Sequence, residues 1–158
     1  MIIYRFTTEQ DAEILASARI SLLNEDSGIA RDALDTLFVS TRDYMRQSLQ
    51  NGSFFAFAAF EGDELIATAG ATLYEVLPGI KLPNGKIAYI QNVYVAPEHR
   101  RVGVGRELIR LCVDESQARG YTRITLSATE SGAELFKTCG FAPAPHVGLF
   151  EMEFLGGL

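Results

Sequence analysis

The chain has 158 residues, which is enough for one domain with a substantial apolar core. Hydrophobic residues make up 47% of it and charged residues 22%, as in ordinary globular proteins, and the apolar run at residues 51–60 is too short to cross a bilayer. The net charge of −6 disfavours nucleic acid as a partner, because phosphate backbones bind basic surfaces; it fits solubility alone or a cationic small substrate.

The termini and the rarer residue types point to a cytoplasmic protein. We expect no membrane segment and no secretory signal, since the first residues lack a basic region followed by an apolar block. Cys112 and Cys139 are isolated from each other, as is usual in a reducing compartment. His99 and His146 do not lie at metal-ligand spacing from a cysteine or carboxylate cluster, so we expect no metal site.

The first third of the chain is predicted to be helical. Thr7 with Gln10 three residues later forms a capping-box pattern that would begin a helix. Apolar residues then recur at helical spacing: Ile14, Leu15, Ala18 and Leu22. A second helix is predicted over residues 40–50. Its buried side would carry Tyr44, Met45 and Leu49.

The middle of the chain is predicted to form strands. Residues 53–60 and 64–76 are rich in aromatic and β-branched residues and read as a hairpin that turns at Gly62. Residues 77–86 contain the glycines and prolines of an exposed loop. Residues 87–95 are apolar at nearly every position, which predicts a strand buried on both faces.

Helices and strands alternate in the rest of the chain. A helix is expected from Arg106, with one apolar stripe, and should end at Gly120. A strand over 122–129, a helix over 130–141 closed by Gly140, and a last strand over 148–154 would follow. With no repeat and no linker, the pattern predicts a single α/β domain, residues 1–158, built on one mixed sheet.

The segment PEHRRVGVGREL, residues 97–108, connects a predicted strand to a predicted helix. The first amides of a helix are unpaired and carry partial positive charge, and Gly103 and Gly105 would let an anion approach the backbone. The glycines could also serve the geometry of the turn alone. Arg106 stands against the helix dipole and four residues from Arg110, which a bound phosphate would explain; solvent, Glu107 or Glu98 could satisfy it instead.

Two familiar phosphate loops do not fit these residues. A P-loop needs a lysine and a hydroxyl after its glycines, and neither follows Gly105. A dinucleotide fingerprint needs a third glycine where Leu108 stands, and it belongs after the first strand rather than after two helices and a hairpin.

Residues 100–105, RRVGVG, match the [QR]-x-x-G-x-[GA] signature of the GNAT superfamily of acyl-CoA-dependent N-acetyltransferases. Downstream, SGAELFKTCGF (131–141) resembles the family motif in which a tyrosine precedes a Gly-Phe pair by four residues. The resemblance covers about residues 54–154. It implies a mixed, mostly antiparallel twisted sheet flanked by helices, with a splayed central strand pair; the N-terminal helices would lie on the variable acceptor side.

The resemblance also implies that the chain binds acetyl-CoA as a co-substrate. The pyrophosphate would bind at the loop and the first helical turn, formed by Arg100, Arg101, Val102, Gly103, Val104, Gly105 and Arg106. The pantetheine arm would lie along the preceding strand, beside Val93, Tyr94 and Val95. A backbone N–H of that strand, from Val93 or Tyr94, would stabilise the oxyanion. Phe136 occupies the family's tyrosine position; it could pack against the arm but cannot donate a proton.

A free alkylamine has a pKa near ~10.4, so a base must take its proton before it attacks a thioester. Strand parity places Tyr89 and Gln91 on the same side as Val93 and Val95, and Tyr89 could act through water. Glu75 is a second candidate base. Tyr89 could equally be an ordinary strand aromatic. Glu25 could bind the acceptor's ammonium or be a solvated loop acid.

Two functions are therefore open. The first is an N-acetyltransferase that acts on a primary amine: an amino acid, a polyamine, an aminoglycoside-like compound or a peptide α-amine. The second is a non-catalytic acyl-CoA-binding or regulatory domain on the same fold, which the phenylalanine at position 136 motivates. Family members are frequently dimers, so the resemblance is also compatible with a homodimer.

Overall fold

The structure is a computed structural model that describes residues 1–25, 28–144 and 152–153. Within these residues one sheet has the strand order β1-β2-β3-β4-β5, with antiparallel neighbours except for the parallel pair β4–β5. Its strands are β1 (Ile2–Phe6), β2 (Phe54–Glu61), β3 (Glu64–Glu75), β4 (Lys86–Val95) and β5 (Arg123–Leu126). The predicted mixed, mostly antiparallel sheet is confirmed.

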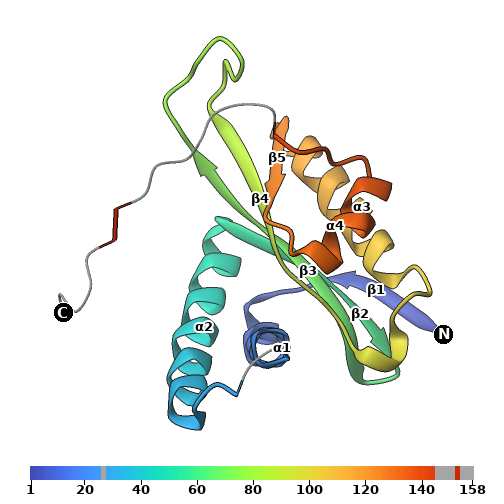
Figure 1. The fold of residues 1–158 in the computed structure, drawn as a ribbon. Coiled ribbons are helices and arrows are strands. Elements are labelled where there is room, and N and C mark those ends of the chain that lie inside the picture. Colours follow the sequence, from blue (N-terminus) through green and yellow to red (C-terminus); the bar gives the residue numbers. More distant parts are fainter. Residues whose placement is uncertain (26–27, 145–151, 154–158) are drawn as a thin grey trace.

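Helices cover both faces of the sheet. Helices α1 (Ala12–Asn24) and α2 (Arg31–Asn51) lie on one face, and α3 (Val104–Ala118) and α4 (Glu130–Thr138) lie on the other (Figure 1). Two short 3-10 turns, Glu9–Asp11 and Pro97–His99, precede α1 and α3. No helix in the described part of the chain is long and apolar enough to cross a membrane.

The core has two layers, one on each face of the sheet. On the α3 side, Phe55 and Phe57 of β2 pack with Leu108 and Cys112 of α3. On the α1/α2 side, β2 and the two helices bury Leu15, Met45, Phe54 and Ala56. Because β2 is covered on both faces, its sequence FFAFAAF is apolar throughout rather than alternating.

Strand β4 is less buried than the sequence predicts. Its first half contains the buried residues Ile87, Ala88 and Ile90. From Val93 to Val95 the side chains are half-buried, since a cavity lies beside this part of the strand. The prediction of a strand covered on both faces is therefore right only for the N-terminal half.

Strand β1 is absent from the sequence-based prediction. It is five residues long and pairs with β2 from Ile2↔Glu61 to Phe6↔Phe57. Ile3 and Phe6 stay exposed on this edge strand, so the segment lacks the burial that marks β2, β3 and β4.

The predicted capping box at Thr7 is displaced by one residue. Thr8 is the residue that accepts from the N–H of Gln10, at 3.3 Å, while Asp11 accepts from the N–H of Thr8 at 2.8 Å. The hydroxyl of Thr7 instead donates to the carbonyl of Ala56 at 3.0 Å and ties the end of β1 to β2. Both threonines fit the sequence pattern. Thr8 caps the helix because the hydroxyl of Thr7 is already bonded to β2.

Helix α2 is longer than the predicted 40–50 segment. It ends at Gly52, whose φ of 82° is the left-handed C-cap. Met45 is buried and Leu49 packs against the core, as predicted, but Tyr44 is 51% exposed and its predicted burial is wrong. One edge-to-face contact with Phe54 holds the Tyr44 ring at the surface.

The remaining helix ends follow the glycines. Gly120 (φ 87°) and Gly140 (φ 97°) follow α3 and α4, as predicted. Helix α3 begins at Val104, two residues before the predicted start, and β5 is shorter than the predicted 122–129 strand. The predicted strand 148–154 lies outside the described residues except for positions 152 and 153, which are in no strand.

An ion pair beside β1 predicts how stability depends on pH. The Nη2 atom of Arg5 lies 2.9 Å from Oδ1 of Asp11, and this hydrogen bond is the main cause that lowers the pKa of Asp11. A carboxylate with a lowered folded pKa stabilises the fold above its unfolded pKa of 3.8, and this contribution is lost as the pH falls through the folded pKa. We expect Asp11→Asn to lower the Tm at neutral pH but not in strong acid. Thermal unfolding across this range, with the exposed turn residue Asp63→Asn as control, checks it; a constant Tm difference at every pH would contradict it.

Candidate functional site

Strand β4 contains a bulge. Gln91 pairs with Gly70 and Tyr94 pairs with Thr68, so two residues of β4 stand opposite one residue of β3. The first of the two, Asn92, has φ 57°, which asparagine tolerates better than most residues. Beyond Ile90, β4 no longer pairs with β5. The predicted splayed strand pair is confirmed.

The bulge reverses the strand's parity. Ile90, Val93 and Val95 all pack toward the core on the α3 side. Gln91 instead accepts a hydrogen bond at 2.5 Å from the hydroxyl of Thr72 and lies toward α1 and α2. The prediction that Gln91 shares a side with Val93 and Val95 is wrong, because an extra residue at a bulge shifts the alternation by one.

The loop after β4 presents a series of unpaired amides. Arg101 has φ 66° and Gly103 has φ 93°, two left-handed residues separated by one position. Glu107 makes the first helical bond here, from its N–H to the carbonyl of Gly103 at 3.1 Å. Among the described residues, none accepts a hydrogen bond from the N–H groups of residues 101–106. Such a run of amides at a helix N-terminus binds anions.

The arginines around this loop have different partners. Arg100 donates through Nε to the carbonyl of Val95 at 2.8 Å and forms an ion pair with Glu25, at the end of α1. Glu25 is therefore neither a free solvated acid nor available to a substrate ammonium in this conformation.

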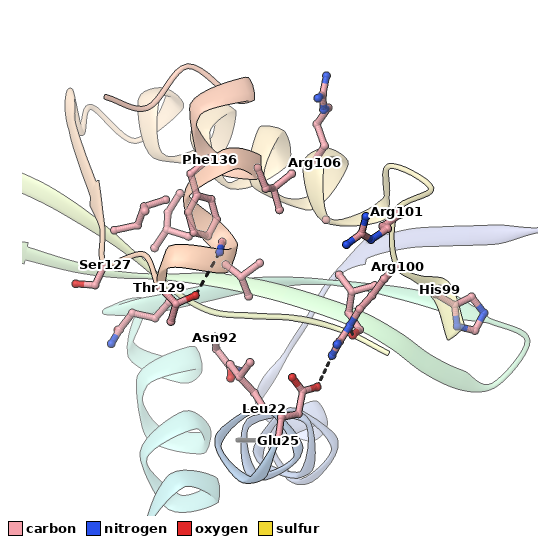
Figure 2. Close-up of a pocket in the computed structure, with 18 of the residues that line it drawn as sticks. Leu22, Glu25, Asn92, His99, Arg100, Arg101, Arg106, Ser127, Thr129 and Phe136 are labelled. Atoms are coloured by element: carbon pink, nitrogen blue, oxygen red, sulfur yellow. Dashed lines mark hydrogen bonds and ion pairs between the residues drawn. The ribbon is translucent and has the colours of Figure 1, made fainter. Parts of the chain in front are cut away.

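Arg101 and Arg106 form no ion pair with any residue that the structure describes. Arg110 is held at 2.6 Å by Glu107 and at 2.7 Å by Asp114, and the Arg110 hydrogen bond lowers the pKa of Glu107. The alternative in which Glu107 satisfies Arg106 is not realised. Both residues are exposed, and the Arg106 side chain extends away from the loop, as in the alternative in which solvent satisfies it (Figure 2).

A cavity of about 520 Å³ extends from this loop into the gap between β4 and β5. We call it the first cavity. It is lined by Leu22, Glu25, Ile90, Gln91, Asn92, Val93, Val95, His99, Arg100, Arg101, Gly103, Gly105, Arg106, Leu126, Ser127, Thr129, Gly132, Leu135 and Phe136. Figure 2 shows Arg100 and Arg101 at one end and Phe136 and Thr129 toward the other, with the Arg106 side chain extending away from them. The cavity is thus cationic at its loop end and largely apolar along β4 and α4.

Most of the predicted coenzyme-binding residues line the first cavity: Val93, Val95, Arg100, Arg101, Gly103, Gly105, Arg106 and Phe136. Three do not. Val102 is 71% exposed, the Val104 side chain is buried in the core, and Tyr94 lies in the strand beside Thr68. The backbone of residues 102 and 104 still contributes to the run of free amides.

The two predicted bases do not line the cavity. The hydroxyl of Tyr89 donates to Oγ of Ser127 at 3.1 Å, and Ser127 itself lines the first cavity. Glu75 is exposed at the end of β3, opposite Lys86. Tyr89 is therefore connected to the cavity through the hydroxyl of Ser127. Glu75 lies opposite the first residue of β4, at the end of that strand remote from the bulge.

Sequence reasoning missed two side chains at the bulge. The sequence pattern places Gln91 only by strand parity and assigns no role to Asn92, yet both line the first cavity. The available signal was an asparagine within the apolar segment IAYIQNVYV, since asparagine in a strand often marks a left-handed residue. Apart from Phe136, which the Gly-Phe motif marks, the residues of β5 and α4 that line the cavity carry no comparable pattern.

Comparison with known proteins agrees with this geometry. The sequence model of the acetyltransferase (GNAT) family matches residues 21–141. The uncharacterised N-acetyltransferase YitH of Bacillus subtilis (strain 168) is 31% identical over 109 residues, which are 66% of this chain and only 34% of that protein. The chain thus spans about a third of the length of this relative.

Two solved structures are similar over nearly their full length. A predicted acetyltransferase of Clostridium acetobutylicum, crystallised with acetyl-CoA, has a TM-score of 0.85 and 25% identity, with 96% of each chain covered. A GCN5-related N-acetyltransferase of Ralstonia eutropha JMP134 has a TM-score of 0.82 and 28% identity, over 96% of this chain and 99% of the other. With the bulged strand, the free amides and the family match in agreement, this chain belongs to the GNAT family of acetyltransferases.

Proposed function

We propose that this protein transfers the acetyl group of acetyl-CoA to a primary amine. The observation that carries the proposal is the run of free N–H groups over residues 101–106, at a cavity beside the half of β4 that does not pair with β5. The amides suit a diphosphate, and β4 beyond Gln91 offers backbone groups to an extended amide-containing chain. Acetyl-CoA combines these two features.

The residues of the first cavity fit this molecule from end to end. Arg101 and Arg106 add positive charge at the amides, where the pyrophosphate would lie. Val93 and Val95 supply the wall for the pantetheine arm, and Phe136 packs across from them on α4. The N–H of Val93 or Tyr94 is the proposed donor to the oxyanion. Val93 is the better supported of the two, because it is one of the two bulge residues and has no register partner in β3, whereas Tyr94 pairs with Thr68.

The proton of the attacking amine needs an acceptor, and Tyr89 is the better supported of the two predicted bases. Its hydrogen bond to Ser127 connects the phenol to the first cavity, where water could complete a relay. Glu75 has no such connection to the cavity. The side chain of Phe136 has no acidic proton to donate, so the thiolate of coenzyme A would leave without a general acid at this position.

A cytoplasmic setting is proposed from the two cysteines. Both are free thiols, and burial raises the pKa of Cys112 to about 12, so this side chain is unreactive in the folded protein. Free thiols are typical of reducing compartments.

The proposal is tested by incubating the native protein with acetyl-CoA and a panel of primary amines, with thiol release and the mass of the acetylated amine as readouts. We expect tight coenzyme binding in calorimetry and turnover with at least one class of amine. Tight binding without turnover on any amine would show a non-catalytic binding domain. No binding at millimolar coenzyme would show that the first cavity is assigned incorrectly.

A further inference from the structure

A second cavity lies on the other side of the bulge. It has a volume of about 310 Å³ and is lined by residues of α1, α2, β2 and β4: Arg19, Leu37, Ser40, Thr41, Tyr44, Met45, Phe54, Gln91 and Asn92. Gln91 and Asn92 line both cavities, so the bulge forms their shared wall. An amine bound in the second cavity would therefore meet a thioester carried along β4 in the first.

The shared wall contains a buried polar atom without a partner. Asn92 is only 7% exposed, and its buried Oδ1 accepts no hydrogen bond from any residue that the structure describes. A buried carbonyl oxygen normally has a donor, because leaving it unpaired is unfavourable. An amine N–H is the donor that this position suits, and the position borders both cavities.

A cation lies on the helix side of the second cavity. Arg19 of α1 is half-buried and forms no ion pair with a described carboxylate. It shares one helix face with Leu22 and Glu25 of the first cavity, and Arg100 already neutralises Glu25.

Gln91 supplies hydrogen-bond donors to the same cavity. Because the hydroxyl of Thr72 donates to Oε1 of Gln91, the amide N–H groups of Gln91 remain as donors. A half-buried guanidinium with amide donors nearby suits a carboxylate.

The rest of the wall is mainly apolar. Leu37, Tyr44, Met45 and Phe54 supply aliphatic and aromatic surface, and the Tyr44 ring meets Phe54 edge to face. The volume lies at the lower end of the range for small-molecule sites, which favours a compact ligand over an oligosaccharide.

We propose that the second cavity selects a small amino acid with an apolar side chain as the acetyl acceptor. Asn92 accepts from the amino group, Arg19 binds the carboxylate, and Tyr44, Met45 and Phe54 hold the side chain. The inference rests on the proposed function. The amine nitrogen bonds to the acetyl carbon and the carbon–sulfur bond breaks with its electron pair on sulfur. The amine proton leaves through the proposed Tyr89–Ser127 water relay to solvent, and the thiolate takes a proton from solvent, so the products are an N-acetyl amino acid and the free thiol of coenzyme A.

The experiment compares leucine with leucinamide, which lacks the carboxylate, as acceptors for the native protein with saturating acetyl-CoA. We expect kcat/KM for leucine to exceed that for leucinamide by about tenfold or more, since a charge-assisted contact is lost in the amide. Spermidine, an aminoglycoside, glucosamine-6-phosphate and a short peptide with a free α-amine complete the panel. Leucine binding is also followed by calorimetry in the presence of coenzyme A.

The variant Arg19→Gln isolates the carboxylate contact. We expect it to raise KM for leucine about tenfold and to bring the ratio of leucine to leucinamide near one. Arg46→Gln, which removes an exposed arginine of α2 outside both cavities, is the matched control and should keep the native ratio. Asn92→Gly keeps the left-handed backbone and removes the carboxamide, so leucine binding in the presence of coenzyme A should weaken.

The outcomes separate the inference from the proposed function. Turnover of polyamines, aminoglycosides, sugar phosphates or peptides in preference to leucine would overturn the amino-acid acceptor and leave acetyl transfer intact. An unchanged leucine preference in Arg19→Gln would overturn the role of Arg19. If the native protein acetylated no amine at all, the proposed function itself would fail.

Discussion

Gly103→Val is expected to lower the affinity for acetyl-CoA by about a hundredfold or more, which corresponds to about 2.7 kcal/mol of binding free energy. Gly103 has φ 93°, where an L-residue is strained by about 1–3 kcal/mol, so valine would pull the loop out of its conformation. No described protein atom lies within 4 Å of an added Cβ, so the side chain would project into the open space at the loop, where the anion is proposed to bind. Calorimetric titration with coenzyme A measures the change.

The control for this substitution is Gly52→Val. Gly52 has φ 82°, and no described atom lies within 4 Å of its added Cβ either, but it caps α2 and lines neither cavity. The two variants should lose similar stability because the backbone strain is similar. Only Gly103→Val should lose coenzyme. Native-like affinity in a folded Gly103→Val protein would refute the assignment of the anion site.

Leu108→Ala is expected to lower the free energy of unfolding by about 2–5 kcal/mol, the range for deleting a buried leucine side chain. Leu108 is 0% exposed and packs on the sheet one turn after Val104, where α3 begins. For a chain of this size each kcal/mol lowers the Tm by about 2–4 °C. Thermal and denaturant unfolding measure the loss.

Leu77→Ala makes the same change at a leucine that is 92% exposed, in the loop before β4. It should shift the Tm by no more than a degree or two, since surface substitutions are usually within about 0.5 kcal/mol. Equal losses in the two variants would mean that α3 is not packed on the sheet as the structure has it.

The parts of the fold that the sequence predicted are those with a strong local pattern. The hairpin turn at Gly62, the ends of α3 and α4 at Gly120 and Gly140, and the glycine loop all depend on backbone conformations that few residues adopt. The loop's chemistry was also predictable, because free amides follow from any helix N-terminus. These features are local, so a short segment of sequence contains them.

The parts that it missed depend on contacts distant in the chain. Thr7 and Thr8 fit the capping pattern equally well, and the hydrogen bond from Thr7 to Ala56 decides between them. The exposed side of Tyr44 is set by how α2 lies on β2 rather than by helical spacing.

The bulge is the most consequential of these misses for the site. Regular alternation along β4 predicts that Gln91 and Val93 point to the same face of the sheet. Because of the bulge in the pairing with β3, they point to opposite faces. The acceptor side therefore could not be derived from parity, and the position of Asn92 between two cavities is visible only in three dimensions.

The bulge also separates the two cavities, which determines how substitutions can affect each of them. Leu37, Ser40 and the other α2 side chains reach the second cavity and none of them reaches the glycine loop. Substitutions in α2 can therefore change the shape of the second cavity while the first cavity keeps its shape. One extra residue in β4 thus places the cavity lined by α2 and the cavity at the glycine loop on opposite sides of the bulge, so a substitution in α2 that reshapes the one need not disturb the other.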